Sequence, residues 1–335
     1  MERIDSETIA LYAGLRERLE ISENMRSVAS LPGDFVTKTV KNIFYHYFQA
    51  TLPGGRMQIY LGPDSDEIRK LIDVRLRGKE NAAVDIALFQ RLGAQIMAGN
   101  VGPVIPDMAR IISRLSDCAV FQAGGVLVGS MAFQILETHL GVRFDKKITA
   151  TRDIDFSGNN HVALAVPHAK ADIPSAIESL QMGFFPVPRL SNKEPSTSYA
   201  VRGKTLRIDL LTSQIKTHDK PVFISRFNAA AQPLKFLDYC IENSINAVLI
   251  CGTPFLVRVP QPARFALHKL IVSQERSASA ADKKLNDIAQ ARLLLEVLHE
   301  DRPGDIESAK NALEQRGTGW KKKLQTACKE AGVEL

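Results

Sequence analysis

Three aspartates in the middle of the chain have the residue type and spacing that a divalent cation needs. Asp153 and Asp155 form an Asp-x-Asp pair. Residues two apart on a β-strand point to the same face, so the two carboxylates can hold one cation together. Charged residues make up 24% of the chain, so such a pair also arises by chance. The prediction of a metal site therefore depends on the residues around the pair.

The third aspartate, Asp209, lies on a predicted strand over residues 205–211, TLRIDLL. Alternation places Arg207 and Asp209 on one face and three aliphatic residues on the other. Three carboxylates can hold two Mg²⁺ ions about 4 Å apart, which clamp the attacking and leaving oxygens of a nucleotidyl transfer. The alternative is an ordinary strand aspartate that Arg207 or solvent satisfies.

A glycine-rich stretch precedes the aspartates, at residues 121–130, FQAGGVLVGS. Glycine lets the backbone approach a ligand closely. The apolar residues after Ser130 recur with helical spacing, so Ser130 is expected near a helix N-terminus, where backbone N–H groups attract phosphate. We predict a phosphate-binding turn at Gly129 and Ser130, with Gly125 as the second candidate. The alternative is a tight turn between a strand and a helix.

The order of these motifs resembles that of the polymerase-β-like nucleotidyltransferase superfamily. It consists of a Gly-Ser turn, a helix, Thr-x-Asp-x-Asp and a single aspartate on a later strand, over about residues 120–212. The resemblance is to the bacterial branch of stand-alone and abortive-infection-type nucleotidyltransferases in particular. One departure is a polar segment at residues 141–150, which indicates an inserted loop or an extra strand.

The resemblance implies a role for each motif residue. Gly129 and Ser130 would bind the phosphates of a nucleoside triphosphate. Asp153 and Asp155 would bind both metal ions, which would be Mg²⁺ or Mn²⁺. Asp209 would complete the second metal site and help to activate the acceptor hydroxyl.

Two amphipathic helices are predicted within residues 260–298. In abortive-infection-type nucleotidyltransferases, a lysine on the first such helix and a Lys-x-x-Asp motif on the second lie near the nucleotide. Lys269, Lys284 and Asp287 resemble these residues in placement. The alternatives are solvated lysines and a Lys284–Asp287 surface pair worth only about 0.2–0.5 kcal/mol. His268 is predicted to be a partly buried helix residue rather than an acid or base.

The predicted fold class is α+β, with the mixed β-sheet of the nucleotidyltransferase fold as its core. We expect an N-terminal α+β extension over residues 1–116 that includes a β-hairpin at 34–61. A catalytic domain over residues 117–259 and a C-terminal helical domain over residues 260–335 follow.

Further elements are predicted from periodicity and turn residues. Strands around residues 233–240 and 247–259 are expected to extend the mixed sheet, with a sharp turn at 251–254. A polar loop at residues 191–198 is a candidate lid or acceptor-binding element. The predicted helices lie at residues 5–20, 64–100, 107–115 and 173–180.

The composition predicts a protein of the cytoplasm that does not enter a membrane. No apolar run is long enough to cross a bilayer, and the first residues lack the basic start and apolar core of a signal peptide. The four cysteines show no Cys-x-x-Cys spacing, which indicates reduced thiols rather than disulfides or zinc ligands. The net charge of +6 is compatible with a polyanionic partner but does not by itself predict one.

We therefore predict an enzyme, a nucleotidyltransferase that depends on Mg²⁺ or Mn²⁺. It would transfer a nucleoside monophosphate from a nucleoside triphosphate to an acceptor hydroxyl and release pyrophosphate. The acceptor would be an RNA end, as in a tRNA-like RNA, a protein or a small molecule. The alternative is a non-catalytic protein of the same fold that binds RNA or a partner as a regulator in a phage-defence or toxin–antitoxin system. The three carboxylates favour the enzyme.

Overall fold

The computed structural model describes most of the chain. The described residues are 1–24, 33–52, 55–102, 104–122, 124–144, 161–165, 172–189, 194–204, 206–214 and 220–335. Asp153 and Asp155 lie outside the described residues, and so do residues 191–193 of the predicted lid loop. The geometry expected of the Asp-x-Asp pair therefore stays a prediction.

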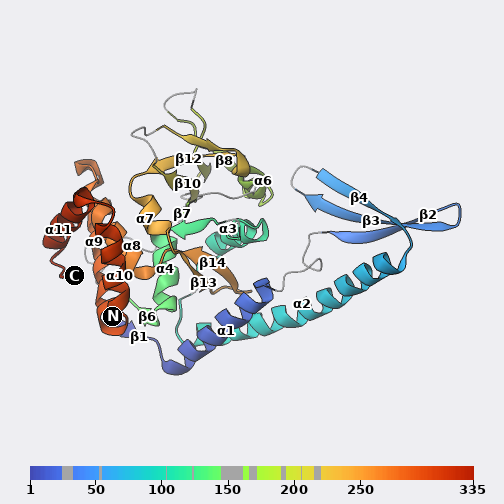
Figure 1. Cartoon of the computed structure of the whole chain (residues 1–335), viewed down its shortest axis with the longest axis horizontal. Helices are drawn as coiled ribbons and strands as arrows, with labels where there is room; N and C mark the ends of the chain where they lie inside the picture. Colours follow the sequence, from blue (N-terminus) through green and yellow to red (C-terminus); the bar gives the residue numbers. More distant parts are fainter. Residues whose placement is uncertain are drawn as a thin grey trace.

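A mixed β-sheet forms the centre of the fold (Figure 1). Its strands in the described part of the chain are β5 (Val126–Val128), β7 (His161–Ala165), β8 (Phe184–Pro186), β9 (Ser198–Val201), β10 (Arg207–Ser213), β11 (Val222–Ile224) and β12 (Ala229–Leu234). The order across the sheet is β11, β12, β10, β7 and β5, with β9 beside β10 and β8 beside β9. β10 is parallel to β7 and β12, whereas β5 and β11 pair antiparallel with their neighbours. The predicted mixed sheet is thus confirmed.

The strand that carries Asp209 alternates as predicted. Ile208 and Leu210 are buried in the core, Arg207 is exposed and Asp209 is half-buried. Asp209 therefore lies on the face of β10 opposite the buried aliphatic side chains.

The helices predicted around this sheet are present. They are α3 (Pro106–Asp117), α4 (Gly129–His139) and α6 (Ile173–Glu178). α4 begins directly after β5 and buries Met131, Phe133, Ile135 and Leu136, which is the one-sided pattern expected from the sequence. Because β5 ends at Val128, the predicted Gly-Ser turn is the junction between a strand and a helix.

Residues 229–241 differ from the sequence prediction. The strand expected around residues 233–240 is β12, which ends at Leu234. Phe236 then adopts a left-handed backbone with φ of 65°, and α7 (Leu237–Ile241) follows. Leu237 and Cys240 are both buried and lie about one helical turn apart. In a segment this short, the pattern of apolar residues does not distinguish a helix from a strand.

The strand pair expected at residues 247–259 is present as β13 (Ile245–Leu249) and β14 (Phe255–Val259). The prediction that it extends the mixed sheet is wrong. In the described part of the chain the pair forms its own two-stranded antiparallel sheet, with register Ala247 opposite Val257. β14 packs against β5 and α3. Among the described residues it forms no backbone pairing with a strand of the central sheet.

The C-terminal region is helical, as predicted. It contains α8 (Pro262–Gln274), α9 (Ala281–Asp301), α10 (Pro303–Glu314) and α11 (Thr318–Ala331). α8 contacts α7, α9, α10 and α11, and most of its residues are buried. Two of these buried residues, Arg264 and Lys269, are charged, so α8 needs carboxylate partners on its neighbours.

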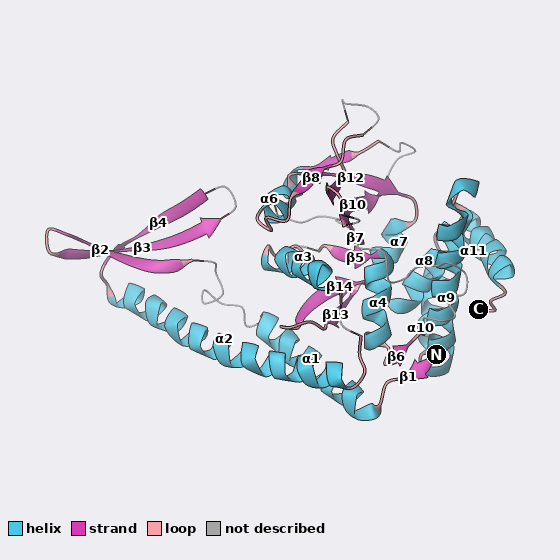
Figure 2. Cartoon of the chain, turned by 180° about the vertical axis from the view of Figure 1, so that it is seen from behind, coloured by secondary structure: helices cyan, strands magenta, loops and turns pink. Residues whose placement is uncertain are grey.

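The N-terminal helices pack side by side (Figure 2). α1 (Ser6–Asn24) corresponds to the first predicted helix, and α2 (Asp66–Ala98) is one continuous helix where one or two were expected. A second apolar cluster joins α1 and the end of α2 to β13, through Tyr12, Leu15, Phe89, Ile96 and Val248. The other end of α2 extends away from the central sheet in both views.

A separate antiparallel sheet lies at the far end of α2 (Figure 1). It consists of β2 (Asp34–Val40), β3 (Ile43–Leu52) and β4 (Gly55–Pro63), so the single hairpin predicted at residues 34–61 is incomplete. The missed turn is the two-residue connection Lys41-Asn42, where both residues have positive φ, as tight hairpins require. Arg75 of α2 ties this sheet to the helix, because its guanidinium lies 5.5 Å from the centre of the Phe48 ring.

The first residues of the chain contact the C-terminal helices. β1 (Glu2–Arg3) pairs with β6 (Val142–Arg143), and Arg3 forms an ion pair with Glu300 at 2.6 Å, near the end of α9. The proposed division at residues 116 and 259 stays a prediction. None of the described helices is both long and apolar enough to span a membrane.

A buried contact between α1 and α4 gives a pH prediction. The Tyr12 hydroxyl accepts a hydrogen bond from the Val248 backbone N–H at 3.0 Å and lies 3.4 Å from His139 Nδ1. Burial, reinforced by the charge of Arg16, lowers the pKa of His139 to about 4. In the unfolded chain the His139 imidazole takes up a proton below about pH 6.5, whereas in the folded protein it stays uncharged down to about pH 4.

The free energy of unfolding should therefore fall as the pH is lowered from about 6.5 to 4, by up to about 1.4 kcal/mol per pH unit from His139. Urea denaturation at pH 5 and pH 7 measures this. His139→Gln should reduce the difference between the two pH values. His299→Gln, on the exposed side of α9, should leave the difference unchanged. An equal pH dependence in His139→Gln and the wild type would contradict the assignment.

Candidate functional site

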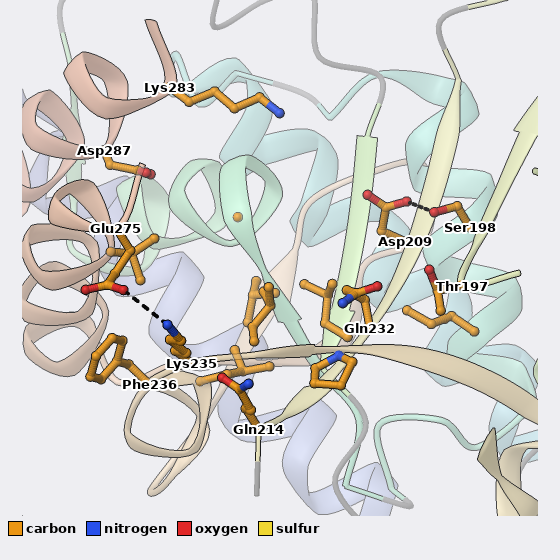
Figure 3. Close-up of a pocket in the computed structure, with 18 of the residues that line it drawn as sticks. Thr197, Ser198, Asp209, Gln214, Gln232, Lys235, Phe236, Glu275, Lys283 and Asp287 are labelled. Atoms are coloured by element: carbon orange, nitrogen blue, oxygen red, sulfur yellow. Dashed lines mark hydrogen bonds and ion pairs between the residues drawn. The ribbon is translucent and has the colours of Figure 1, made fainter. Parts of the chain in front are cut away.

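A cavity of about 710 Å³ lies between the central sheet and the helices α8 and α9. Figure 3 shows that Asp209 and Ser198 line one side and Asp287 and Lys283 line the opposite side. Six basic and three acidic residues are among the described residues that line it. The excess of positive charge favours an anionic ligand, and the volume is in the range of small-molecule sites.

The sheet brings Asp209 and the Gly-Ser turn to the same wall. Ala163 of β7 pairs with Val128 of β5 on one side and with Asp209 of β10 on the other. Val128 and Asp209 therefore lie in one row across three strands. Gly129 and Ser130 directly follow Val128, and all three line the cavity together with Asp209.

Asp209 is held in place by two neighbours. Its Oδ1 accepts hydrogen bonds from Ser198 Oγ at 2.5 Å and from Arg207 Nε at 2.8 Å. Arg207 also donates to Ser198 Oγ at 3.0 Å, so each of the three side chains is hydrogen-bonded to the other two. Figure 3 shows the bond between Ser198 and Asp209. The contact with Arg207 is the one expected if Asp209 were an ordinary strand aspartate. In the structure this contact holds the carboxylate at the cavity wall.

The Gly-Ser turn has the geometry of an anion site. Gly129 has φ of 71°, a conformation that side-chain-bearing residues rarely adopt. It opens α4, and Val128 at the cap position provides no side-chain hydrogen bond to the first turn. The N–H groups of that turn are thus not occupied by a side-chain cap, and the positive end of the helix dipole points to the cavity wall.

Gly125, the second candidate, lies elsewhere. Its N–H donates to the carbonyl of Val120 at 2.8 Å, in the turn between α3 and β5. A Cβ at this position would come within 2.7 Å of the Val120 side chain, so close packing explains the glycine. It is not one of the residues that line the cavity.

The lysine and aspartate predicted on the two helices form a buried ion pair. Lys269 Nζ lies 2.8 Å from Asp287 Oδ1, and both side chains are only 9% exposed. Arg276 completes the group, with its NH2 2.9 Å from Asp287 Oδ2. Burial alone would raise the pKa of Asp287, but the charges of Lys269 and Arg276 outweigh it and hold that pKa below its ordinary value. The group carries one net positive charge at the cavity wall.

Lys284 does not line the cavity, whereas the adjacent Lys283 does. Lys284 Nζ pairs with Glu330 of α11 at 2.5 Å. Lys283 extends from α9 toward the interior of the cavity (Figure 3), and the described residues include no ion-pair partner for it. Lys283 therefore has the place at the cavity that the sequence analysis expected for Lys284.

Further polar residues line the sheet wall below Asp209. Arg189 donates to Gln232 Oε1 at 2.8 Å and to Glu194 Oε2 at 3.0 Å. Thr197, at the end of the predicted lid loop, lines the cavity beside Ser198. On the floor Lys235 is 3.6 Å from Glu275, next to Phe236 (Figure 3). With these residues, the polar lining of the cavity extends over a larger area than one phosphate group would contact.

His268 is buried as predicted, but it also lines the cavity. Burial, followed by the charge of Lys269, lowers its pKa to about 3. The imidazole is therefore neutral at pH 7 and is not poised as an acid or base. Asn286, one residue before Asp287, lines the cavity too.

The described residues test the fit of a metal ion only in part. Asp209 provides an oxygen ligand of the kind that Mg²⁺ binds. No group of three or more His, Cys, Asp or Glu that could hold a metal occurs among the described residues. Asp153 and Asp155 are needed to complete the set, and the segment that carries them leads into β7, the strand next to Asp209. Asp155 precedes His161 by six residues, a reach of at most about 20 Å.

Sequence reasoning missed several cavity residues that recur at helical spacing. On α8 they are Phe265, His268 and Val272, three to four residues apart, Arg276 follows just after the end of this helix, and on α9 they are Lys283 and Asn286. This periodicity is visible in the sequence, but it also marks the buried face of an ordinary helix pair. Only the packing of α8 on α9 shows which of these residues reach the cavity.

A comparison with protein families matches residues 106–314 to a family model described as nucleotidyltransferase. The match covers more than half of the 335 residues. It includes all of the described residues that line the cavity, together with Asp153 and Asp155. No curated protein and no solved structure matches the chain.

Proposed function

The chain belongs to the nucleotidyltransferase family, and we propose that it transfers a nucleoside monophosphate from a nucleoside triphosphate to an acceptor hydroxyl. The protein is therefore an enzyme of the EC 2.7.7 class. The observation that carries the proposal is the shared cavity of the Gly129-Ser130 turn, Asp209 and the Lys269–Asp287–Arg276 group. We propose the abortive-infection-type branch, because Lys269 and Asp287 both line the cavity, although Lys284 does not.

The cationic wall would bind and orient the triphosphate. The uncapped first turn of α4 offers backbone N–H donors to phosphate oxygens, and Lys283 and the Lys269–Arg276 pair add positive charge on the opposite side. Fixing the triphosphate between two walls places its α-phosphate near Asp209. Such positioning is the main protein contribution to phosphoryl-type transfer.

Asp209, Asp153 and Asp155 would hold divalent cations, Mg²⁺ or Mn²⁺, which supply charge for the attacking and leaving oxygens. The acceptor oxygen forms a bond to the α-phosphorus, and the bond from that phosphorus to the bridging oxygen of pyrophosphate breaks. Asp209 helps to accept the proton of the hydroxyl. Ser198 and Arg207 keep the carboxylate aimed at the cavity through their hydrogen bonds to Oδ1.

The experiment incubates the protein with each of the four nucleoside triphosphates, labelled on the α-phosphate, together with Mg²⁺ and total RNA or a cell lysate. We expect the label to appear on RNA, on protein or on a small molecule, which identifies the acceptor class. Asp153→Ala combined with Asp155→Ala should abolish labelling. Asp282→Ala, an exposed aspartate of α9 outside the cavity, should retain it. Equal labelling by the double variant and the wild type would refute the proposed mechanism.

A further inference from the structure

Three side-chain atoms on the helical wall of the cavity are buried without a hydrogen-bond partner among the described residues. They are Nδ1 and Nε2 of His268 and Oδ1 of Asn286. Both residues line the cavity. Native proteins rarely leave buried polar atoms unsatisfied, because each one costs the free energy of its lost hydration. A molecule that enters the cavity is therefore the expected partner of these atoms.

Phosphate alone cannot satisfy all three of these atoms. His268 is uncharged at neutral pH, because burial and the charge of Lys269 lower its pKa to about 3. A neutral imidazole has one nitrogen that donates and one that accepts, and Asn286 Oδ1 only accepts. Phosphate oxygens at neutral pH accept hydrogen bonds, so they cannot satisfy Asn286 Oδ1. The partner must offer donors as well as acceptors.

The position of the two residues relates them to the triphosphate. His268 precedes Lys269 on α8, and Asn286 lies between Lys283 and Asp287 on α9. The residues that carry the unpartnered atoms thus line the same helical wall as the cations that would hold phosphates. Phe265, one turn before His268, also lines the cavity and adds an aromatic surface. Neutral donors and acceptors beside an aromatic ring are what a nucleobase needs and a phosphate does not.

We propose that His268 and Asn286 form a nucleobase subsite that reads the hydrogen-bonding edge of the base and so gives the enzyme a preference among nucleoside triphosphates. The proposal rests on the proposed function, since it places the base of the same substrate. Nucleobase edges carry donors and acceptors in a pattern that differs from base to base. A site whose buried polar atoms are satisfied by one base leaves them unpaired with another, and this difference produces selectivity.

The test measures the binding of five probes by calorimetry in the presence of Mg²⁺. The probes are ATP, GTP, CTP, UTP and inorganic tripolyphosphate, which has the charge of the phosphates but no base. We expect one nucleotide to bind about tenfold or more tightly than both the weakest nucleotide and tripolyphosphate. In His268→Leu and in Asn286→Leu, the affinity for this nucleotide should approach that for tripolyphosphate. The affinity for tripolyphosphate itself should stay within about threefold of the wild type.

Controls separate recognition from folding. His299→Leu on α9 and Asn311→Leu on α10 make the same changes at exposed positions outside the cavity and should keep the nucleotide preference. The melting temperature of the ligand-free His268→Leu and Asn286→Leu proteins should stay equal or rise, because unsatisfied buried polar atoms are replaced by apolar ones of similar size. This result would show that a loss of preference is not a loss of structure.

Other outcomes would overturn the proposal in distinguishable ways. Equal affinity of the wild type for all five probes would refute the base subsite and leave the proposed function standing. The wild type is also tested with the four corresponding deoxyribonucleoside triphosphates. If the variants lose affinity equally for all four ribonucleotides, and the wild type binds ribonucleotides more tightly than deoxyribonucleotides, the two residues contact the ribose and the base subsite is refuted. Absence of binding for every probe would refute both the subsite and the proposed function.

Discussion

Asp209→Asn reduces the rate of nucleotidyl transfer by about 10³-fold or more under single-turnover conditions, while the protein stays folded. The amide keeps the size of the carboxylate but loses its negative charge, and metal-assisted charge stabilisation is worth several kcal/mol in the transition state. It also cannot take up the proton of the acceptor hydroxyl. The fold should tolerate the change because Asp209 is half-buried at the cavity wall and not in the apolar core.

The control for this prediction is Asp282→Asn, which makes the same chemical change on the exposed side of α9. It should retain the wild-type rate. Binding of the nucleoside triphosphate with Mg²⁺, measured separately, should weaken in Asp209→Asn because one oxygen ligand has lost its charge. A rate within tenfold of the wild type would show that Asp209 is not part of the reacting site. Its contacts with Ser198 and Arg207 would then be structural only.

The elements that carry the site could be predicted because each has a strong local pattern. Alternation located β10 and the exposed face of Asp209, and the run of buried residues from Met131 to Leu136 located α4. Each element buries one face, so its apolar residues recur at the period of a strand or of a helix, and this period is visible in the sequence. Two predictions failed for different reasons. α7 was missed because its five residues fit a helix or a strand equally well. β13 and β14 were predicted correctly as strands, but their local patterns do not show that they pair only with each other and not with the central sheet.

The helical wall could be predicted only in part, because its residues depend on how α8 and α9 face each other. Lys283 and Lys284 are adjacent, and a helix turns by about 100° from one to the next. Both are within one turn of Asp287, so spacing to that residue does not choose between them. The choice is made by α11, which provides Glu330 as a partner for Lys284 and leaves Lys283 directed to the cavity. An ion pair between residues so far apart in the chain cannot be predicted from the local sequence.

The buried ion pair of Lys269 and Asp287 gives the largest expected effect on stability. Asp287→Leu should lower the free energy of unfolding by about 3–5 kcal/mol, because it leaves the buried Lys269 charge and one side of Arg276 without a counterion. Lys269→Met should cost less, since Asp287 keeps Arg276 as its partner at 2.9 Å. The double variant Lys269→Met with Asp287→Leu should recover part of the loss, because no unpaired charge remains buried between α8 and α9.

Urea denaturation of the two single variants and the double variant measures the coupling between the pair. The matched control is the Lys284–Glu330 pair, which has the same charge types on α9 and α11 but lies at the surface. Lys284→Met and Glu330→Gln should each change the free energy of unfolding by no more than about 1 kcal/mol. Coupling energies of equal size for the two pairs would contradict the view that burial sets the strength of the Lys269–Asp287 interaction.

The same variants separate a structural role of the pair from a role in binding. The folded Lys269→Met protein has no ammonium group at position 269, and its remaining Asp287–Arg276 pair carries no net charge, so it should bind inorganic tripolyphosphate at least about tenfold more weakly than the wild type, a loss of about 1.4 kcal/mol. Lys284→Met should bind tripolyphosphate as the wild type does, because Lys284 does not line the cavity. A Lys269→Met protein that is folded and binds tripolyphosphate normally would limit the pair to joining α8 and α9. Weakened binding in a stable protein shows instead that Lys269 is buried at this place because its charge holds the triphosphate.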